Sequence, residues 1–310
     1  MSLLTKKLSF SLGAGAPRPQ TAVEVAPEGA LAASLPGGGA APVFAFAALP
    51  AGALIPGIAE PNIYAAPVVA EALRVVLEQV SPRNRCVTLI VPDTSARVFV
   101  LDFDTLPAKA SDALPVLRFR LRKMVPFDVE HAAVSYQVLK RNSGGDKEPM
   151  KVLVTVIPGS ILAEYEAAVR ATGYEPGSVL PSSLAALAAL DSPEPALAAN
   201  LSSLALTTSI TNGDDLLLYR TIELPQDNEG RVAEVQRSVA VAMAYFEDKL
   251  GHRPRKLHYA GAVPSGDFAR AVNDPELEVV EVAPTPATGA ITTVGPLGFA
   301  GISGALAGVA

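Results

Sequence analysis

The sequence predicts an α/β protein built from two related halves. Short apolar or alternating segments, typical of strands, are interleaved with longer segments that have helical periodicity. This order occurs twice, before and after a proline-marked boundary at residues 191–196. With 310 residues, of which 49% are hydrophobic, the chain is long enough to form one large core or two smaller ones.

Four strands are predicted in the first half. Residues 87–91 (VTLIV) form a continuous apolar run, which is typical of a strand that is buried on both faces. Residues 97–103 alternate between apolar and polar side chains, and so does the segment 133–139. The polar, glycine-containing segment 141–149 separates that strand from 151–157, so we expect a hairpin with a surface loop.

A helix is predicted between the second and third of these strands. Its expected core face carries Leu114, Leu117, Leu121 and Met124. Pro115 is tolerated only in a first turn, so we expect the helix to begin near Leu114. Pro126 disfavours helical geometry at Val125, and the helix is expected to end there.

Three further helices and a second hairpin complete the pattern. Ser160 is the expected cap of a helix that Gly173 ends, and an alanine-rich helix covers 182–191. The turn dipeptide Asn212-Gly213 joins two strands of a hairpin. The other two elements are a long amphipathic helix at 233–251 and a strand at 256–261.

Charge and composition exclude several functions. The net charge is −6, so no nucleic-acid partner is expected. Cys86 is the only cysteine, so the chain has no internal disulfide and a reducing, cytoplasmic location is expected. The three histidines lack metal-ligand spacing, and we predict no metal site. Prolines interrupt both long uncharged stretches, so no membrane span is expected, and residues 1–19 are predicted to be flexible.

Four segments together resemble the PilM family of type IV pilus assembly proteins, which are relatives of the cell-division protein FtsA. They are 91–107 (VPDTSARVFVLDFDTLP), 117–139 (LRFRLRKMVPFDVEHAAVSYQVL), 158–179 (PGSILAEYEAAVRATGYEPGSV) and 233–261 (AEVQRSVAVAMAYFEDKLGHRPRKLHYAG). The resemblance implies a two-lobed actin-like (ribonuclease H-like) fold with an inserted FtsA-type subdomain. It implies a first lobe at 20–91 plus 161–196, the insert at 92–160 and a second lobe at 197–310.

The resemblance also implies a nucleotide cleft, but its phosphate-binding motifs are altered. Such clefts use Asp-x-Gly turns whose backbone N–H groups face the phosphates and whose carboxylates hold Mg²⁺ through water. Along 22–34, Glu24 falls on the Asp position and Ala26 on the Gly position, while Pro27 and Leu31 fall on the Ser and Lys positions. The second turn falls near Asn200, where neither Asp nor Gly is present, and an adenosine-side turn retains Gly261.

The residues Glu24, Gly29, Asn200 and Gly261 are therefore candidates for a degenerate nucleotide cleft. We expect no catalytic residues and no bound cofactor, because the lost groups supply the electrostatic stabilisation on which phosphoryl transfer depends. The alternative is an ATP-binding switch, with Mg²⁺, that uses a divergent phosphate loop.

The predicted insert helix is a candidate partner-binding element. In the PilM family, the insert and the first lobe receive the N-terminal peptide of a bitopic inner-membrane protein, PilN. Arg118, Phe119, Arg122 and Phe127 are the candidate contact residues here. The resemblance thus implies an adaptor that this partner recruits to the inner membrane and that links it to other pilus platform or motor proteins. The cytoplasmic part of a type II secretion platform is the second alternative.

Overall fold

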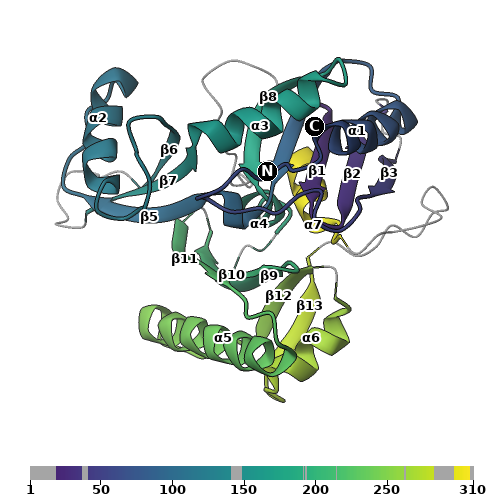
Figure 1. The fold of residues 1–310 in the computed structure, drawn as a ribbon. Helices are drawn as coiled ribbons and strands as arrows, with labels where there is room; N and C mark the ends of the chain where they lie inside the picture. Colours follow the sequence, from purple (N-terminus) through teal and green to yellow (C-terminus); the bar gives the residue numbers. More distant parts are fainter. Residues whose placement is uncertain are drawn as a thin grey trace, which may run out of the picture.

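The computed structural model describes residues 19–36, 41–140, 149–190, 192, 194–213, 215–261, 263–282 and 297–307. Three sheets organise these residues (Figure 1). The first sheet contains β1 (Thr21–Ala26), β2 (Gly29–Ser34), β3 (Val43–Ala48), β4 (Cys86–Val91) and β8 (Glu175–Pro181). The second contains β9 (Ala196–Leu201), β10 (Ala205–Asn212), β11 (Asp215–Glu223), β12 (Lys256–Gly261) and β13 (Glu278–Glu281). The third contains β5 (Arg97–Phe103), β6 (Ala132–Lys140) and β7 (Met150–Pro158).

The two larger sheets have the same topology. The first has the strand order β3-β2-β1-β4-β8 and the second has the order β11-β10-β9-β12-β13. In each sheet the three strands that come first in sequence are paired antiparallel. The fourth strand pairs parallel with the first, and the fifth pairs parallel with the fourth. The predicted pair of related halves is therefore confirmed, and each half has the strand order of a ribonuclease H-like lobe.

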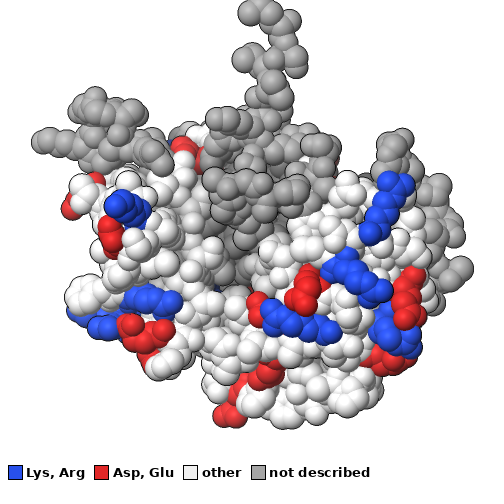
Figure 2. Space-filling model, turned by 90° about the horizontal axis from the view of Figure 1, so that it is seen from above, with Lys and Arg blue, Asp and Glu red and all other residues white. Residues whose placement is uncertain are grey.

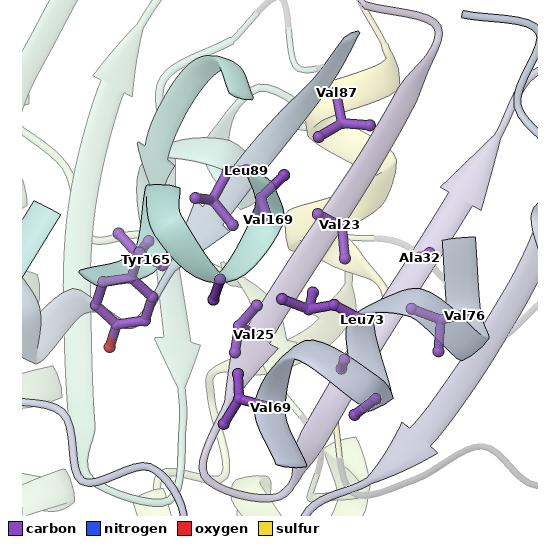
Figure 3. Close-up of a cluster of buried hydrophobic side chains, with 14 of the residues drawn as sticks. Val23, Val25, Ala32, Val69, Leu73, Val76, Val87, Leu89, Tyr165 and Val169 are labelled. Atoms are coloured by element: carbon purple, nitrogen blue, oxygen red, sulfur yellow. The ribbon is translucent and has the colours of Figure 1, made fainter. Parts of the chain in front are cut away.

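Helices cover both faces of the first sheet. On one face, α1 (Ala66–Val80) and α3 (Gly159–Arg170) pack on β1, β2 and β4 (Figure 3). Val23 and Val25 point toward these helices, whereas the alternate residue Ala22 belongs to the core of the opposite face. That opposite face is covered by α4 (Ser182–Leu187) and α7 (Ala300–Leu306).

The second sheet is covered on one face by α5 (Asn228–Leu250) and α6 (Ser265–Val272). Its other face contacts α4, so the α4–α7 pair lies between the two large sheets. The sequence-based division places α7 in the second lobe, but the helix packs on the sheet of the first lobe. Asp227 caps α5 by accepting from the Gly230 N–H at 2.7 Å, and Gly251 ends the helix at φ 75°.

The third sheet carries α2 (Ala110–Leu121) on one face. Its strands match the predicted 97–103, 133–139 and 151–157, whereas most of the predicted loop 141–149 lies outside the described residues. The helix differs from its prediction in two ways. It begins at Ala110, so Pro115 lies beyond the first turn, and its buried face continues from Leu121 to Val125 while Met124 is 41% exposed.

The helix ends at Leu121, before the end that Pro126 predicts at Val125. Residues 122–124 form a turn, after which the Val125 N–H donates to the Leu121 carbonyl at 3.1 Å. Val125 is buried beside Leu117 and Leu121, so the residue before Pro126 is itself part of the core under α2.

Two glycines let helix α7 approach its neighbours closely: Gly304 faces α4, and Gly301 faces the carboxyl group of Glu24. A Cβ on Gly304 would lie 1.8 Å from the Ala185 carbonyl oxygen, and a Cβ on Gly301 would lie 2.7 Å from Glu24 Oε2. Phe299, just before α7, packs edge-on against Phe44 with a centroid separation of 5.3 Å. The α4–α7 contact therefore depends on backbone-to-backbone packing, which no larger residue permits.

We expect Gly304→Ala to destabilise the protein by about 1–3 kcal/mol. The new methyl group would overlap the Ala185 carbonyl oxygen, so α4 and α7 would have to move apart. Urea unfolding measures the change. Gly266→Ala in α6 is the matched control, since its Cβ would meet nothing within 4 Å and alanine favours the helix by about 0.5–1 kcal/mol. Equal unfolding midpoints for the two variants would contradict the packing argument.

Candidate functional site

A narrow cleft lies between the two large sheets. It is bordered by the end of β1 and the turn after it, by the short 3-10 turn η1 (Asp93–Ser95) and by Ser182 at the start of α4. From the second sheet come the end of β9, the turn 202–204 and Gly261, and residues 297–301 close it. The cleft has a volume of about 50 Å³, which is room for a few water molecules.

The structure brings together three of the four predicted cleft residues. Glu24, Asn200 and Gly261 all line the cleft. Gly29 does not: it pairs with Ala26 and Ala48 within the first sheet, and the Ala47 carbonyl oxygen occupies the position that its Cβ would take. The prediction that Gly29 belongs to the cleft is wrong, because its glycine character serves the packing of β2 on β3. Ala262, the partner of Gly261 in the predicted turn, lies outside the described residues.

The turn between β1 and β2 is poorly suited to a phosphate. Ala26 pairs with Gly29, so the turn consists of Pro27, which has no N–H, and Glu28, which is negatively charged. Leu31, at the position where a lysine was expected, is 1% exposed in the core beneath α7. A lysine there would bury its ammonium in an apolar cluster, so this hairpin offers no cation to the cleft.

The equivalent turn in the second sheet is already satisfied by its own side chain. Ser202 Oγ accepts from the Ala205 N–H at 3.0 Å and from the Leu204 N–H at 3.3 Å. Arg231 donates to the carbonyl oxygens of Ser202 and Ser203 at 2.8 and 2.7 Å. The serine hydroxyl thus occupies the N–H groups that a phosphate would otherwise accept from.

Buried carboxyl groups on the first-lobe side dominate the electrostatics of the cleft. Ser182 Oγ donates to Glu24 Oε1 at 2.6 Å. Burial raises the pKa of Glu24, the Ser182 hydrogen bond opposes this shift, and the charges of Asp93 and Glu28 add to it, so that the pKa lies at about 7. Glu24 therefore carries only part of its charge at neutral pH.

Asp93 connects the two lobes through a chain of hydrogen bonds. It accepts from the Ser183 N–H at 3.0 Å and from Ser183 Oγ at 2.6 Å. Asn200 of β9 donates to Ser183 Oγ at 2.8 Å, so the chain runs from η1 through α4 to the second sheet. Burial raises the pKa of Asp93 to about 6, although both hydrogen bonds from Ser183 oppose the shift.

Three residues of this cleft region, Asp93, Ser182 and Ser183, were not among the predicted site residues. Asp93 follows directly after the predicted buried strand, and the carboxyl end of a parallel strand is where functional residues gather, so a signal was present. Ser182 and Ser183 carried no sequence signal other than that of residues at the start of a helix. No lysine or arginine is among the described residues that line the cleft, and no cluster of three metal-binding side chains occurs in the described part of the chain.

The four predicted partner-binding residues are placed on or beside α2. Arg118 donates to the carbonyl oxygens of Val129, Glu130 and Ala132, so its guanidinium holds the end of α2 to the start of β6. Arg122 pairs with Glu130 at 2.5 Å. These contacts give both arginines an intramolecular role.

The two predicted phenylalanines differ in their surroundings. Phe127 packs partly buried against the core under α2, whereas Phe119 is 68% exposed. On the face shown in Figure 2, basic and acidic atoms of the described residues lie next to one another in small groups. Phe119 is thus the more exposed of the two, and Arg122, although paired with Glu130, also has a side chain that is 57% exposed.

A larger apolar groove lies on the opposite side of the third sheet. Strand alternation directs Val134 and Tyr136 of β6 toward α2, and Ser135 toward the groove. The cavity has a volume of about 180 Å³, and it lies between β6, β7, α3 and β8. Its apolar lining includes Leu153, Ile157, Leu162, Val179 and Leu180. Among the described strands β6 pairs with β7 alone, so the groove runs beside the edge of a sheet.

We expect the protein to lose stability as pH rises from 5 to 8. The folded pKa values of Glu24 and Asp93 lie above their ordinary values of 4.5 and 3.8, so the folded state binds protons that the unfolded state has released. The contribution of the two carboxyl groups to the free energy of unfolding is fully present below their ordinary pKa values. It is lost as the pH rises through their folded-state pKa values. For Glu24 the loss is up to about 3 kcal/mol.

Urea unfolding of Glu24→Gln at pH 5 and pH 8 tests this dependence. Glutamine keeps an acceptor for Ser182 but does not titrate, so the variant should gain stability relative to the wild type as pH rises. Glu247→Gln, on the exposed side of α5, is the control and should follow the wild type. A wild-type stability that increases from pH 5 to pH 8 would contradict the role of the buried carboxyl groups.

Among solved structures, the chain is similar to a protein of the "PilM-PilN type IV pilus biogenesis complex", with a TM-score of 0.72 and 18% sequence identity over 95% of this chain and 100% of that one. It is also similar to the cytoplasmic domain of EpsL, an inner-membrane component of the type II secretion system of Vibrio cholerae. That match has a TM-score of 0.50 and 15% identity, over 87% of this chain and 90% of that one.

No protein-family model and no curated protein matches the sequence. The described helices include none with the length and apolar character needed to cross a membrane. The repeated sheet topology and the similarity over almost the whole chain together show that this protein has the actin-like fold predicted from its sequence.

Proposed function

We propose that this protein is a non-enzymatic adaptor of a type IV pilus assembly platform, with a cleft that no longer binds and hydrolyses ATP. The observation that carries the proposal is the chemistry of the cleft. Its phosphate-facing turns are a Pro-Glu pair and a serine that caps its own backbone, and its described lining holds three acidic side chains and no basic one. A triphosphate would meet repulsion where an ATPase provides N–H donors and cations.

The fold similarity supports the pilus setting. The chain aligns over 95% of its length with a protein from a complex that contains PilN. We infer a PilN-like bitopic protein as the partner, which would hold the adaptor on the cytoplasmic side of the inner membrane and near other platform or motor proteins. The EpsL similarity favours a type II secretion platform as the second candidate, since that neighbour covers most of the chain at a lower TM-score.

Calorimetry with Mg·ATP tests the cleft directly. We expect no saturable heat at ATP concentrations up to about 1 mM and no release of phosphate above a protein-free control. Submillimolar binding of Mg·ATP would establish the alternative, an ATP-dependent switch, and turnover to ADP would show that the divergent turns still perform phosphoryl transfer.

The groove beside β6 is the proposed docking site for the partner's N-terminal peptide. It combines an apolar lining with a strand edge, and an extended peptide could use the edge for backbone pairing and the lining for its side chains. The α2 surface is a weaker candidate for peptide docking than this groove. Arg118 and Arg122 are engaged within the chain, and α2 lies on the other face of the sheet.

We expect Ser135→Arg to weaken peptide binding by about tenfold or more, because a long charged side chain would enter the apolar groove. Fluorescence anisotropy with a labelled N-terminal peptide of the PilN-like protein measures the affinity. Ser135 is exposed, so the substitution leaves the core intact. Phe119→Ala is the matched surface control on α2 and should bind like the wild type. Unchanged affinity in Ser135→Arg together with weakened binding in Phe119→Ala would assign docking to the α2 face instead.

A further inference from the structure

The exposed side of α2 combines apolar and basic side chains. Val116, Phe119 and Arg120 lie at the spacing i, i+3 and i+4, and Lys123 and Met124 follow in the turn after the helix. All five are exposed, and Phe119, at 68%, is the most exposed large hydrophobic residue in the described part of the chain. Apolar groups grouped in this way gain free energy from a surface that removes them from water.

The two basic residues on this side have no acidic partner among the described residues. No ion pair is found there for Arg120 or Lys123, and Arg120 lies over the ring of Phe103 at 5.3 Å. Asp112, the acidic residue of α2, lies about two turns before Arg120, near the start of the helix. A chain with a net charge of −6 thus presents uncompensated positive charge beside exposed apolar side chains.

A second group of exposed apolar residues lacks this positive charge. It lies at and before the start of α1 and consists of Ile55, Tyr64 and Val68. The charged residues beside it in the sequence include Glu60 and Glu71, and the basic residue Arg74 is engaged in ion pairs on α1. Apolar exposure and free positive charge therefore coincide on α2 and not on α1.

This combination fits the surface of an anionic lipid bilayer. Helices that lie in a membrane interface place aromatic and aliphatic side chains below the headgroups, and they hold Arg and Lys at the level of the anionic headgroups. α2 stands at one end of the molecule, on one face of the third sheet, so a flat surface can approach it (Figure 1). An acidic protein would supply the charge, but it would also need a pocket shaped for Phe119.

We propose that this side of α2 is a membrane-contact surface, on which Phe119 and Met124 enter the headgroup region of an anionic bilayer while Arg120 and Lys123 pair with its headgroups. The contact is weak by itself, because stable attachment to a membrane requires two signals of this size. This inference goes beyond the adaptor function. It does not depend on peptide docking, because the groove beside β6 lies on the other face of the third sheet.

Sedimentation of the full chain with vesicles tests the proposal. Vesicles of phosphatidylglycerol and phosphatidylcholine should bind the protein saturably, with half of it bound at about millimolar lipid, and pure phosphatidylcholine should bind it at least about tenfold less. Raising the salt concentration to about 0.5 M should weaken the binding, since salt screens the two cations. No binding to the anionic vesicles would overturn the proposal.

Charge reversal tests whether α2 makes the contact. Arg120→Glu combined with Lys123→Glu should lower the affinity for anionic vesicles by more than about tenfold. Arg237→Glu combined with Lys249→Glu on α5 changes the net charge equally and is the matched control, since these side chains are 66% and 50% exposed. An equal loss in the two double variants would show that only net charge acts, and it would overturn the assignment to α2.

A tryptophan probe tests the apolar part of the contact. The chain contains no tryptophan, so Phe119→Trp introduces a single fluorescent probe. Its emission should shift to shorter wavelength with anionic vesicles and should be quenched by brominated lipid, while Val241→Trp, exposed on α5, should not respond. Phe119→Ala should lower the affinity by about tenfold. An unshifted Phe119→Trp variant that still sediments with the vesicles would overturn the proposed insertion.

The peptide-binding assay separates this result from the adaptor proposal. Arg120→Glu combined with Lys123→Glu should keep the wild-type affinity for the partner peptide, because the groove is on the other face of the sheet. Peptide binding without vesicle binding would overturn the membrane contact alone. If Phe119→Ala also lost the peptide, α2 would be assigned to a protein partner instead. Circular dichroism of each variant confirms folding.

Discussion

The close contact of α7 with α4 is the constraint on which the rest of the molecule depends. The glycine at position 304 lets the two backbones touch, and the glycine at 301 lets α7 lie against the carboxyl group of Glu24. The pair forms the layer between the two large sheets. Because the backbones of the two helices are in contact in this layer, the cleft beside it is small, and the carboxyl groups that face the cleft are removed from water.

That burial changes the electrostatic character of the cleft. In a nucleotide site, carboxylates remain ionised because a metal ion and its water shell compensate them. Here the compensation comes from serine hydroxyls and one backbone N–H, which is weaker, so the pKa values of Glu24 and Asp93 rise to about 7 and 6. The same groups that a Mg²⁺-nucleotide complex would use are thus partly neutral and already hydrogen-bonded within the protein.

Much of the fold could be predicted from the sequence, and the exceptions have physical causes. The strand 87–91, the three strands of the insert and the Asn212-Gly213 hairpin were predicted from local pattern and are present. Strand β2 was not, because its alanine-rich segment is buried on both faces and has no alternation. Strand β8 contains two prolines at the sheet edge, a position that sequence pattern marks as a loop. Met124 was misplaced because α2 ends in an irregular turn that brings Val125 inward instead.

The candidate site depended more on tertiary contacts than the fold did. Glu24 could be placed by its resemblance to a motif, but its partner Ser182 is 158 residues away, and Asp93 meets Ser183 across 90 residues. No local pattern encodes such pairs. Gly29 shows the opposite error, since a glycine beside a predicted turn was assigned to the cleft although its space is taken by the neighbouring strand.

The hydrogen bonds between the lobes give the cleft a defined shape through contacts within the protein alone. In the chain from Asp93 through Ser183 to Asn200, every contact is made by the protein itself, and Arg97 of β5 adds a 3.2 Å ion pair to Glu223 of β11. A nucleotide that bridges two lobes couples their relative position to its own binding, since the bridging contacts exist only while it is bound. When the bridge consists of side chains, the lobes keep their relation at any nucleotide concentration. That property supports the adaptor function proposed above, in which binding surfaces must stay in register with neighbouring proteins, over the alternative of a nucleotide-dependent switch.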